Sequence, residues 1–187
     1  MRSWVVNVEV PADYARRDPE QHLEDIARAA GLSGRGAGML TAASIDDMRE
    51  ATDTGVAVHA TVGIDHPTWA AVDDGLAGDG AFAGDPAPGT INVVAFVPAR
   101  LSDAAMVNAV VTLTEAKTQA LLDAGISATG TASDAVCILA LDAGEKESFC
   151  GPRSLWGARL ARATYRAVSA GCVVGTEAGS AVGDEPE

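Results

Sequence analysis

Aromatic residues, basic residues and cysteines are all scarce in this sequence of 187 residues. Aromatics make up 4 %, and 13 Lys and Arg face 26 Asp and Glu, which gives a net charge of −13. So few rings offer no platform for stacked bases, and so acidic a surface repels phosphate backbones and anionic lipid. The sequence also has no apolar run near the roughly 20 residues that a membrane-spanning helix needs. We therefore expect neither nucleic acid nor a membrane as a partner.

Cysteine and histidine are also too sparse and scattered to form a familiar framework. The three cysteines lie far apart with no C-x-x-C spacing, which predicts reduced thiols in a cytoplasmic protein. The first ten residues enter an alternating pattern directly and lack the apolar stretch of a secretory signal. Two of the histidines are seven residues apart without a third ligand at a usual spacing, so no zinc site is expected. These six residues are Cys137, Cys150, Cys172, His22, His59 and His66.

Hydrophobic residues make up 48 % of the chain, enough for a buried core. Periodicity predicts strands over 3–10, 36–43, 55–63, 90–97 and the apolar end of 127–141. Helices are predicted from an Asp18-Pro19 start to Gly31, over 103–124 after Ser102, and from Ser154 to Gly171. We also expect a helical turn at 45–50 and a mobile Gly- and Asp-rich loop at 73–89.

This mixture predicts an α+β fold. Helices separated by strands, with several strands adjacent in sequence, favour one layered domain over residues 1–171. Its mixed or antiparallel sheet would pack against two to four helices. A disordered acidic tail is expected over 172–187.

The helix predicted over 103–124 carries a lysine on its apolar side. At about 100° per residue, Lys117 falls in the centre of the apolar stripe. It must reach past that surface to solvent, lose its proton or meet a buried carboxylate, because an unpaired buried charge costs several kcal/mol. Glu115 lies on the opposite side with Asn108 and Thr112, where a solvated polar face is the simplest interpretation.

A second cluster of polar groups, TGTASD at residues 129–134, precedes the apolar strand that ends at 141. Hydroxyls and free backbone N–H groups in such a turn can hold an anion or a developing oxyanion, although an ordinary capped turn has the same composition. Asp134 would lie at the start of the buried strand. It is therefore the natural partner for Lys117.

Two other patterns carry less information. The G-x-G-x-G at 34–38 is followed by Met39, so it lacks the third glycine of the dinucleotide-binding fingerprint and is typical of a turn before a strand. Arg159, Arg162 and Arg166 form a stripe on the last predicted helix. They are either a solvated face or a clamp for acidic groups of a partner.

Two long segments carry a family pattern. They read AMVNAVVTLTEAKTQALLDAGISATGTASDAVCILAL at 105–141 and GPRSLWGARLARATYRAV at 151–168. Both closely resemble the adenosylcobinamide amidohydrolase family. Three upstream segments also fit: GAGMLTAA (36–43), ATVGIDHPTWAA (60–71) and PGTINVVAFV (88–97). The resemblance extends from about residue 4 to residue 171.

The resemblance implies hydrolysis of one amide bond in corrinoid salvage. The bond joins the aminopropanol arm of adenosylcobinamide to a propionate of the corrin ring, and the products are adenosylcobyric acid and 1-amino-2-propanol. The partner is thus a small corrinoid. Its cobalt enters with the substrate, so no protein-bound metal or other cofactor is expected. The resemblance leaves the formation of a homo-oligomer open.

Within that activity we assign catalysis to Glu115, Lys117 and Asp134. Either carboxylate is a candidate base for an attacking water, with Lys117 or the turn at 129–133 stabilising the oxyanion. If Lys117 and Asp134 form a buried pair, they hold the turn in shape and Glu115 is the base. Thr131 or Ser133 as a covalent nucleophile is a second route. Substrate contacts are expected from Asn92, Asn108, Thr112, Thr114, Thr129, Gly130, Thr131 and Ser133.

Two alternative functions stay open at this point. The family pattern includes a further segment with a Gly-rich turn upstream of the strand that matches WVVN (4–7) here. A corrinoid-binding protein without activity is therefore the main alternative. An amidohydrolase of similar fold acting on another amide is the third possibility.

Overall fold

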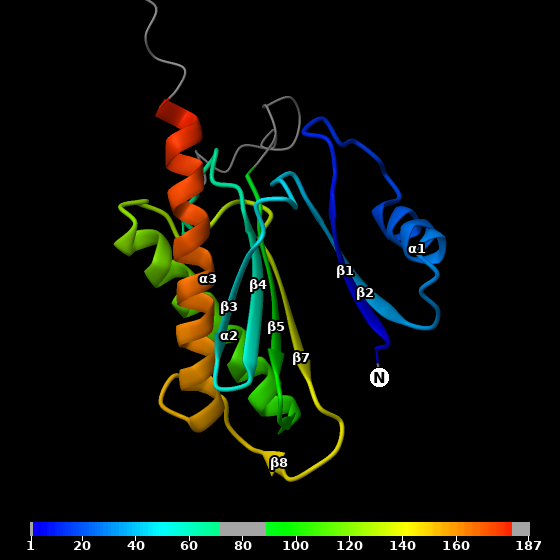
Figure 1. Ribbon diagram of the computed structural model, residues 1–187, viewed down its shortest axis with the longest axis vertical. Coiled ribbons are helices and arrows are strands. Elements are labelled where there is room, and N and C mark those ends of the chain that lie inside the picture. Colours follow the sequence, from blue (N-terminus) through cyan, green and yellow to red (C-terminus); the bar gives the residue numbers. More distant parts are fainter. Residues whose placement is uncertain (1, 72–88, 181–187) are drawn as a thin grey trace, which may run out of the picture.

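The structure, a computed structural model, describes residues 2–71 and 89–180 (Figure 1). Within these residues the chain forms three helices and eight strands. The loop predicted at 73–89 lies outside the described residues except for Gly89. None of the described helices combines the length and the apolar content needed to cross a bilayer.

The centre of the fold is a mixed four-stranded sheet in the order β3-β4-β5-β7. β4 pairs antiparallel with both β3 and β5, and β5 pairs parallel with β7. The strands are β3 (Arg49–Asp53), β4 (Val56–Val62), β5 (Ile91–Val97) and β7 (Ala135–Ala140). The predicted α+β class with a mixed sheet is confirmed.

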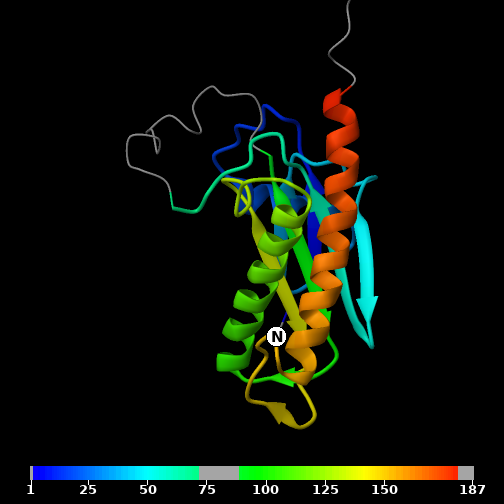
Figure 2. The same cartoon turned by 90° about the vertical axis from the view of Figure 1, so that its left-hand side faces the viewer.

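Two long helices, α2 (Asp103–Asp123) and α3 (Leu155–Ser180), cover one face of this sheet side by side (Figure 2). Alternate residues of β4 and β5 point into the layer between sheet and helices, and the buried helix residues are mostly small. This layer is the hydrophobic core. Its largest fully buried apolar side chains are Ile91, Leu113, Leu121, Leu160, Val56, Val58, Val93, Val97 and Val168.

A smaller unit lies on the other side of the sheet (Figure 1). β1 (Trp4–Glu9) and β2 (Gly36–Thr41) pair in parallel, and α1 (Pro19–Ala29) connects them. A further short parallel pair consists of β6 (Arg100–Leu101) and β8 (Lys146–Glu147). β1 and β2 end at the edge of the molecule where β5 begins, which we call the upper edge (Figure 1).

Local sequence signals explain most helix ends. Ser102 caps α2 by accepting a hydrogen bond from Ala105 N at 3.1 Å, and Ser154 accepts one from Gly157 N at 3.1 Å as α3 begins. The residue before α1 is different. Asp18 occupies the N-cap position, but its carboxylate binds Arg16 and does not cap the helix.

The predicted end of the last helix at Gly171 is wrong. A Cβ at Gly171 would come within 2.5 Å of Val62 Cγ2, so this glycine lets α3 lie close against β4 instead of ending the helix. Residues 172–180 are consequently helical and not part of a disordered tail. Residues 181–187 lie outside the described residues.

The turn predicted at 45–50 is present but shorter than expected. The turn hydrogen bonds are confined to 44–48, and residues 49–53 form β3. β3 and β4 are joined by Thr54 and Gly55, both with positive φ (47° and 91°). Two such residues form the tight hairpin turn whose twist matches that of the strands.

Candidate active site

Lys117 and Asp134 form a hydrogen-bonded ion pair at the upper edge, as the sequence predicted. Their side chains are only 6 % and 14 % exposed. α2 supplies the lysine, and the turn at 129–134 supplies the carboxylate. Burial of this kind is tolerated because each charge finds its partner.

The rest of the Asp134 carboxylate is also occupied. Its Oδ1 accepts hydrogen bonds from Ile91 N at 3.0 Å, from Thr131 N at 3.1 Å and from the Thr131 hydroxyl. A carboxylate has about four acceptor positions, and Asp134 receives four hydrogen bonds, three on Oδ1 and one on Oδ2. Asp134 therefore joins α2, the turn and the start of β5.

Gly130 fits under this ion pair because it has no side chain. A Cβ at this position would collide with Asp134 Oδ2 and with Lys117 Nζ. The Gly130 carbonyl accepts a hydrogen bond from Thr68 N at 2.8 Å. The sequence T-G-T thus places a glycine where the two charged groups pass across the backbone.

Thr129 holds a neighbouring segment in place. Its hydroxyl accepts a hydrogen bond from Ala70 N at 2.7 Å and donates to Thr68 O at 3.3 Å. Its carbonyl accepts one from the Thr118 hydroxyl of α2 at 3.2 Å. The predicted substrate contact at Thr129 thus coincides with a residue that already has three structural partners.

Ser133 faces a small pocket at the upper edge. Ser133 Oγ and Thr90 Oγ1 share a hydrogen bond of 2.7 Å, and the Ser133 hydroxyl also donates to Gly89 O at 3.3 Å. The pocket has a volume of about 170 Å³. It is lined by Val10, Pro11, Ala12, Tyr14, Leu40, Thr41, Ala42, Thr90 and Ser133.

Three candidate residues of α2 lie away from this pocket. Asn108 Oδ1 accepts a hydrogen bond from Cys150 N at 3.0 Å, and the Thr112 hydroxyl donates to Cys150 O at 2.9 Å. The placement of Thr112 on the solvated stripe was wrong, because it is fully buried. The Thr114 hydroxyl donates to its own helix at Val110 O.

Glu115 is exposed, and the described residues offer it no hydrogen bond or ion pair. Two residues apart on a helix, Glu115 and Lys117 point in nearly opposite directions. The structure therefore does not bring Glu115 to the turn at 129–134.

Asn92 is 1 % exposed and joins the two sheets. Its Nδ2 donates to Asn7 Oδ1 and to Leu40 O, both at 2.8 Å, and Asn7 Nδ2 donates to Thr61 Oγ1 at 3.1 Å. This network ties β5 and β4 to the β1–β2 unit. The structure thus places Asn92 inside the protein and not on a surface that a ring could touch.

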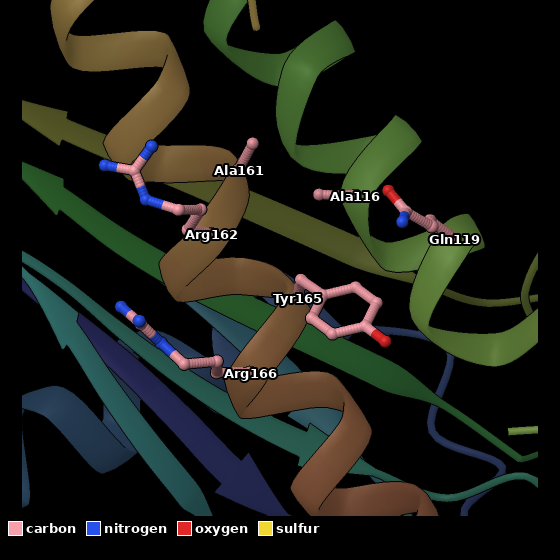
Figure 3. Close-up of a pocket in the computed structure, with 6 residues that line it drawn as sticks. All are labelled: Ala116, Gln119, Ala161, Arg162, Tyr165 and Arg166. Atoms are coloured by element: carbon pink, nitrogen blue, oxygen red, sulfur yellow. The ribbon is translucent and has the colours of Figure 1, made fainter. Parts of the chain in front are cut away.

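A larger groove of about 360 Å³ lies between α2 and α3 (Figure 3). The Tyr165 hydroxyl donates to Asp123 Oδ2 at 3.0 Å, and this bond raises the pKa of Tyr165. Arg162 and Arg166 extend together from α3, away from α2 (Figure 3), and bind Asp53 at 2.7 Å and 3.1 Å. The arginine clamp considered from the sequence thus holds an acidic residue of this chain.

No group of three or more His, Cys, Asp and Glu side chains in the described ranges is arranged to hold a metal ion. His22 contacts Tyr14, and His59 lies 3.9 Å from Glu50. Cys137 and Cys150 carry free thiols.

Comparison with known proteins gives the family. The family model for adenosylcobinamide amidohydrolase matches residues 1–179. The chain belongs to the adenosylcobinamide amidohydrolase family. A protein of that name from Methanosarcina mazei is 27 % identical over 177 residues, which cover 90 % of this chain and 82 % of the relative. Another from Halobacterium salinarum is 34 % identical over 169 residues, which cover 88 % of this chain and 71 % of the relative. No solved structure matches the chain.

The resemblance stated from the sequence is confirmed. Sequence reasoning nevertheless missed three polar residues that line the pocket at the upper edge. Tyr14 lies in a segment without periodicity, and Thr41 and Thr90 lie at strand ends. The sequence could have indicated them only through their positions at or near strand ends, because the ends of several elements meet at the upper edge. Their convergence depends on the position of the β1–β2 unit, which no local pattern specifies.

Proposed function

We propose that this protein hydrolyses the aminopropanol amide of adenosylcobinamide, releasing adenosylcobyric acid and 1-amino-2-propanol in corrinoid salvage. The family match over residues 1–179 and the two relatives that share its description support this activity. Both relatives are covered over more than two thirds of their length. In this proposal the cobalt belongs to the substrate, the protein needs no cofactor of its own, and the reaction takes place in the cytoplasm.

The pocket at the upper edge is the proposed site of the reaction. Its volume of about 170 Å³ is below the range usual for drug-sized ligands, so a corrin ring stays outside and only a side arm enters. The observation that carries this assignment is the buried Lys117–Asp134 pair, which fixes the turn so that Ser133 lies against Thr90 at the pocket.

Each group then has a role that follows from its contacts. Lys117 and Asp134 are positioning residues, since they bind each other and Asp134 also binds the backbone of the turn. The hydroxyls of Ser133 and Thr90 bond each other and Gly89 O, and each becomes a donor to the oxyanion when it turns its proton from that acceptor towards the amide carbonyl. Ser133 as the nucleophile itself is a second route, which its position at the pocket favours over Thr131.

The test compares turnover of adenosylcobinamide by the wild type and by Ser133→Ala. Removal of one oxyanion donor lowers kcat by about 100-fold in comparable cases, and we expect a loss of that size. Thr52→Val is the matched control, because it also removes a hydroxyl, but one that is exposed on β3 and does not line the pocket. Glu115→Gln tests whether Glu115 is the base that activates the attacking water. Near-normal turnover by Ser133→Ala together with a strong loss in Glu115→Gln would show that the reaction does not take place in the proposed pocket.

The same experiment separates the two routes and the alternative function. A trapped acyl-enzyme on Ser133, absent in Ser133→Ala, establishes the covalent route. A corrinoid that binds with a spectral change but is never cleaved supports a binding protein and contradicts the proposed activity.

A further inference from the structure

Among the described residues that line the proposed pocket, most side chains are hydroxyl or apolar groups, and Tyr14 alone has ordinary acid–base chemistry. Amide hydrolysis requires that the leaving amine receive a proton as the C–N bond breaks. The other ionisable groups nearby are committed, because Lys117 and Asp134 bind each other. The site as described so far therefore lacks a proton donor unless Tyr14 supplies it.

Tyr14 is connected to a second titratable group. Its hydroxyl oxygen lies 2.9 Å from His22 Nδ1, and the two rings stack with centroids 5.6 Å apart and an angle of 15° between their planes. Tyr14 N donates to Pro11 O at 3.0 Å, which fixes the turn after β1, while His22 lies in the first turns of α1. Both rings are part-buried.

Two charged neighbours of this pair are bound to each other. Arg16 and Asp18 lie between Tyr14 and His22 in the sequence and bind each other through two hydrogen bonds, at 2.9 and 2.7 Å. The bond to Arg16 lowers the pKa of Asp18. Asp18 therefore stays a carboxylate paired with arginine, and the Tyr14 hydroxyl is left to His22.

We infer that Tyr14 is the catalytic acid for the leaving amine and that His22 is the positioning residue that resupplies its proton; this rests on the proposed function. An imidazolium donates its Nδ1 proton to the tyrosine oxygen, which leaves the phenol O–H free to point into the pocket. As the C–N bond breaks, its electron pair goes to nitrogen and nitrogen takes the phenol proton. The tyrosine oxygen then receives the Nδ1 proton. Tyr14 ends unchanged, and neutral His22 regains a proton from solvent, which has taken up the proton lost by the attacking water.

Two substrates with different leaving groups test this role. One is adenosylcobinamide, whose amine must be protonated to leave. The other is the p-nitrophenyl ester of adenosylcobyric acid at the same propionate, whose phenolate leaves without a proton. We expect Tyr14→Phe to lose about 100-fold in kcat on the amide and to change the hydrolysis of the ester by less than about threefold.

His22→Gln provides an independent comparison. The glutamine amide can still donate a hydrogen bond to the phenol oxygen but cannot pass on a proton, so kcat for the amide should fall while KM stays unchanged. Tyr165→Phe is the control, because Tyr165 is the second of the two tyrosines and bonds to Asp123 in the α2–α3 groove. We expect wild-type rates from it on both substrates.

The outcomes are distinguishable from failure of the proposed function. If the wild type does not cleave adenosylcobinamide, the proposed function fails, whatever the variants do. If the wild type cleaves it and Tyr14→Phe is as fast, Tyr14 is not the acid. Equal losses on amide and ester, in Tyr14→Phe or in a folded His22→Gln, would overturn the acid role in favour of a structural one.

Discussion

Asp134 receives four hydrogen bonds, whereas its partner Lys117 makes one that the structure defines. This asymmetry decides what happens when either member of the ion pair is removed. Without Lys117 the carboxylate keeps three donors. Without the carboxylate the ammonium group is left in a site where it is only 6 % exposed.

We therefore expect Asp134→Asn to destabilise the fold by about 3 kcal/mol or more, because it leaves a buried charge uncompensated. Lys117→Met should cost clearly less. Urea unfolding of the two variants measures the difference, with Lys146→Met as a control on an exposed lysine. A larger loss for Lys117→Met than for Asp134→Asn would contradict the hydrogen-bond arrangement described here.

Predictions about single residues succeeded where they depended on a local sequence pattern. The helical period placed Lys117 on the apolar side of α2, and the only nearby carboxylate before a buried strand was Asp134. The substrate contacts at Asn92 and Asn108 were assigned from residue type alone. In the structure both residues have hydrogen-bond partners within the protein. These partners come from segments more than 40 residues away in the chain, so no local sequence pattern predicts them.

At the scale of elements, the sequence does not show whether a glycine ends a helix or lies inside one. Gly31 and Gly125 have positive φ (74° and 81°) and follow the ends of α1 and α2 as predicted. Gly171 has the same surroundings in the sequence, yet it lies inside α3 against Val62. Only the packing of the helix on β4 distinguishes the two uses.

Gly171→Ala therefore separates propensity from packing. Alanine is favoured over glycine in a helix by about 1 kcal/mol, but here its Cβ would overlap Val62, so we expect a lower free energy of unfolding. Val62→Ala in the same chain should restore part of the loss. Val173→Ala, at an exposed position of the same helix, serves as the control. A more stable Gly171→Ala protein would show that α3 does not approach β4 this closely.

The strands were predicted well where their residues are mostly apolar, and they were missed where the strand is short or polar. β4, β5 and β7 have apolar patterns that identify them directly. β3 reads REATD, with two acidic residues, and is a strand because the Thr54–Gly55 turn folds it back onto β4. β6 and β8 have two residues each, too few for any period to appear.

For the whole molecule, Asp53 connects the edge strand to the last helix. Arg162, with further hydrogen bonds from Thr54 and Arg166, lowers the pKa of Asp53 from 3.8 to about 2. A carboxylate with a lowered pKa stabilises the fold above the unfolded pKa, and this contribution disappears as the pH falls from about 4 through about 2.

Asp53→Asn should therefore destabilise the protein by about 1 kcal/mol at pH 7, since both arginines are half exposed. The difference from the wild type should shrink steadily below pH 4 and be small at pH 2. Urea midpoints of both proteins between pH 7 and pH 2 measure this, with the exposed Asp142→Asn as control. A difference that stays constant down to pH 2 would rule out the ionic contribution.

The central claim is that this chain cleaves the aminopropanol amide of a corrinoid. The direct measurement is to incubate the purified protein with adenosylcobinamide and to separate the products by chromatography over time. We predict adenosylcobyric acid and 1-amino-2-propanol in equal amounts, at a rate proportional to the protein concentration. Recovery of intact adenosylcobinamide, even with a spectral change that reports binding, would contradict the account.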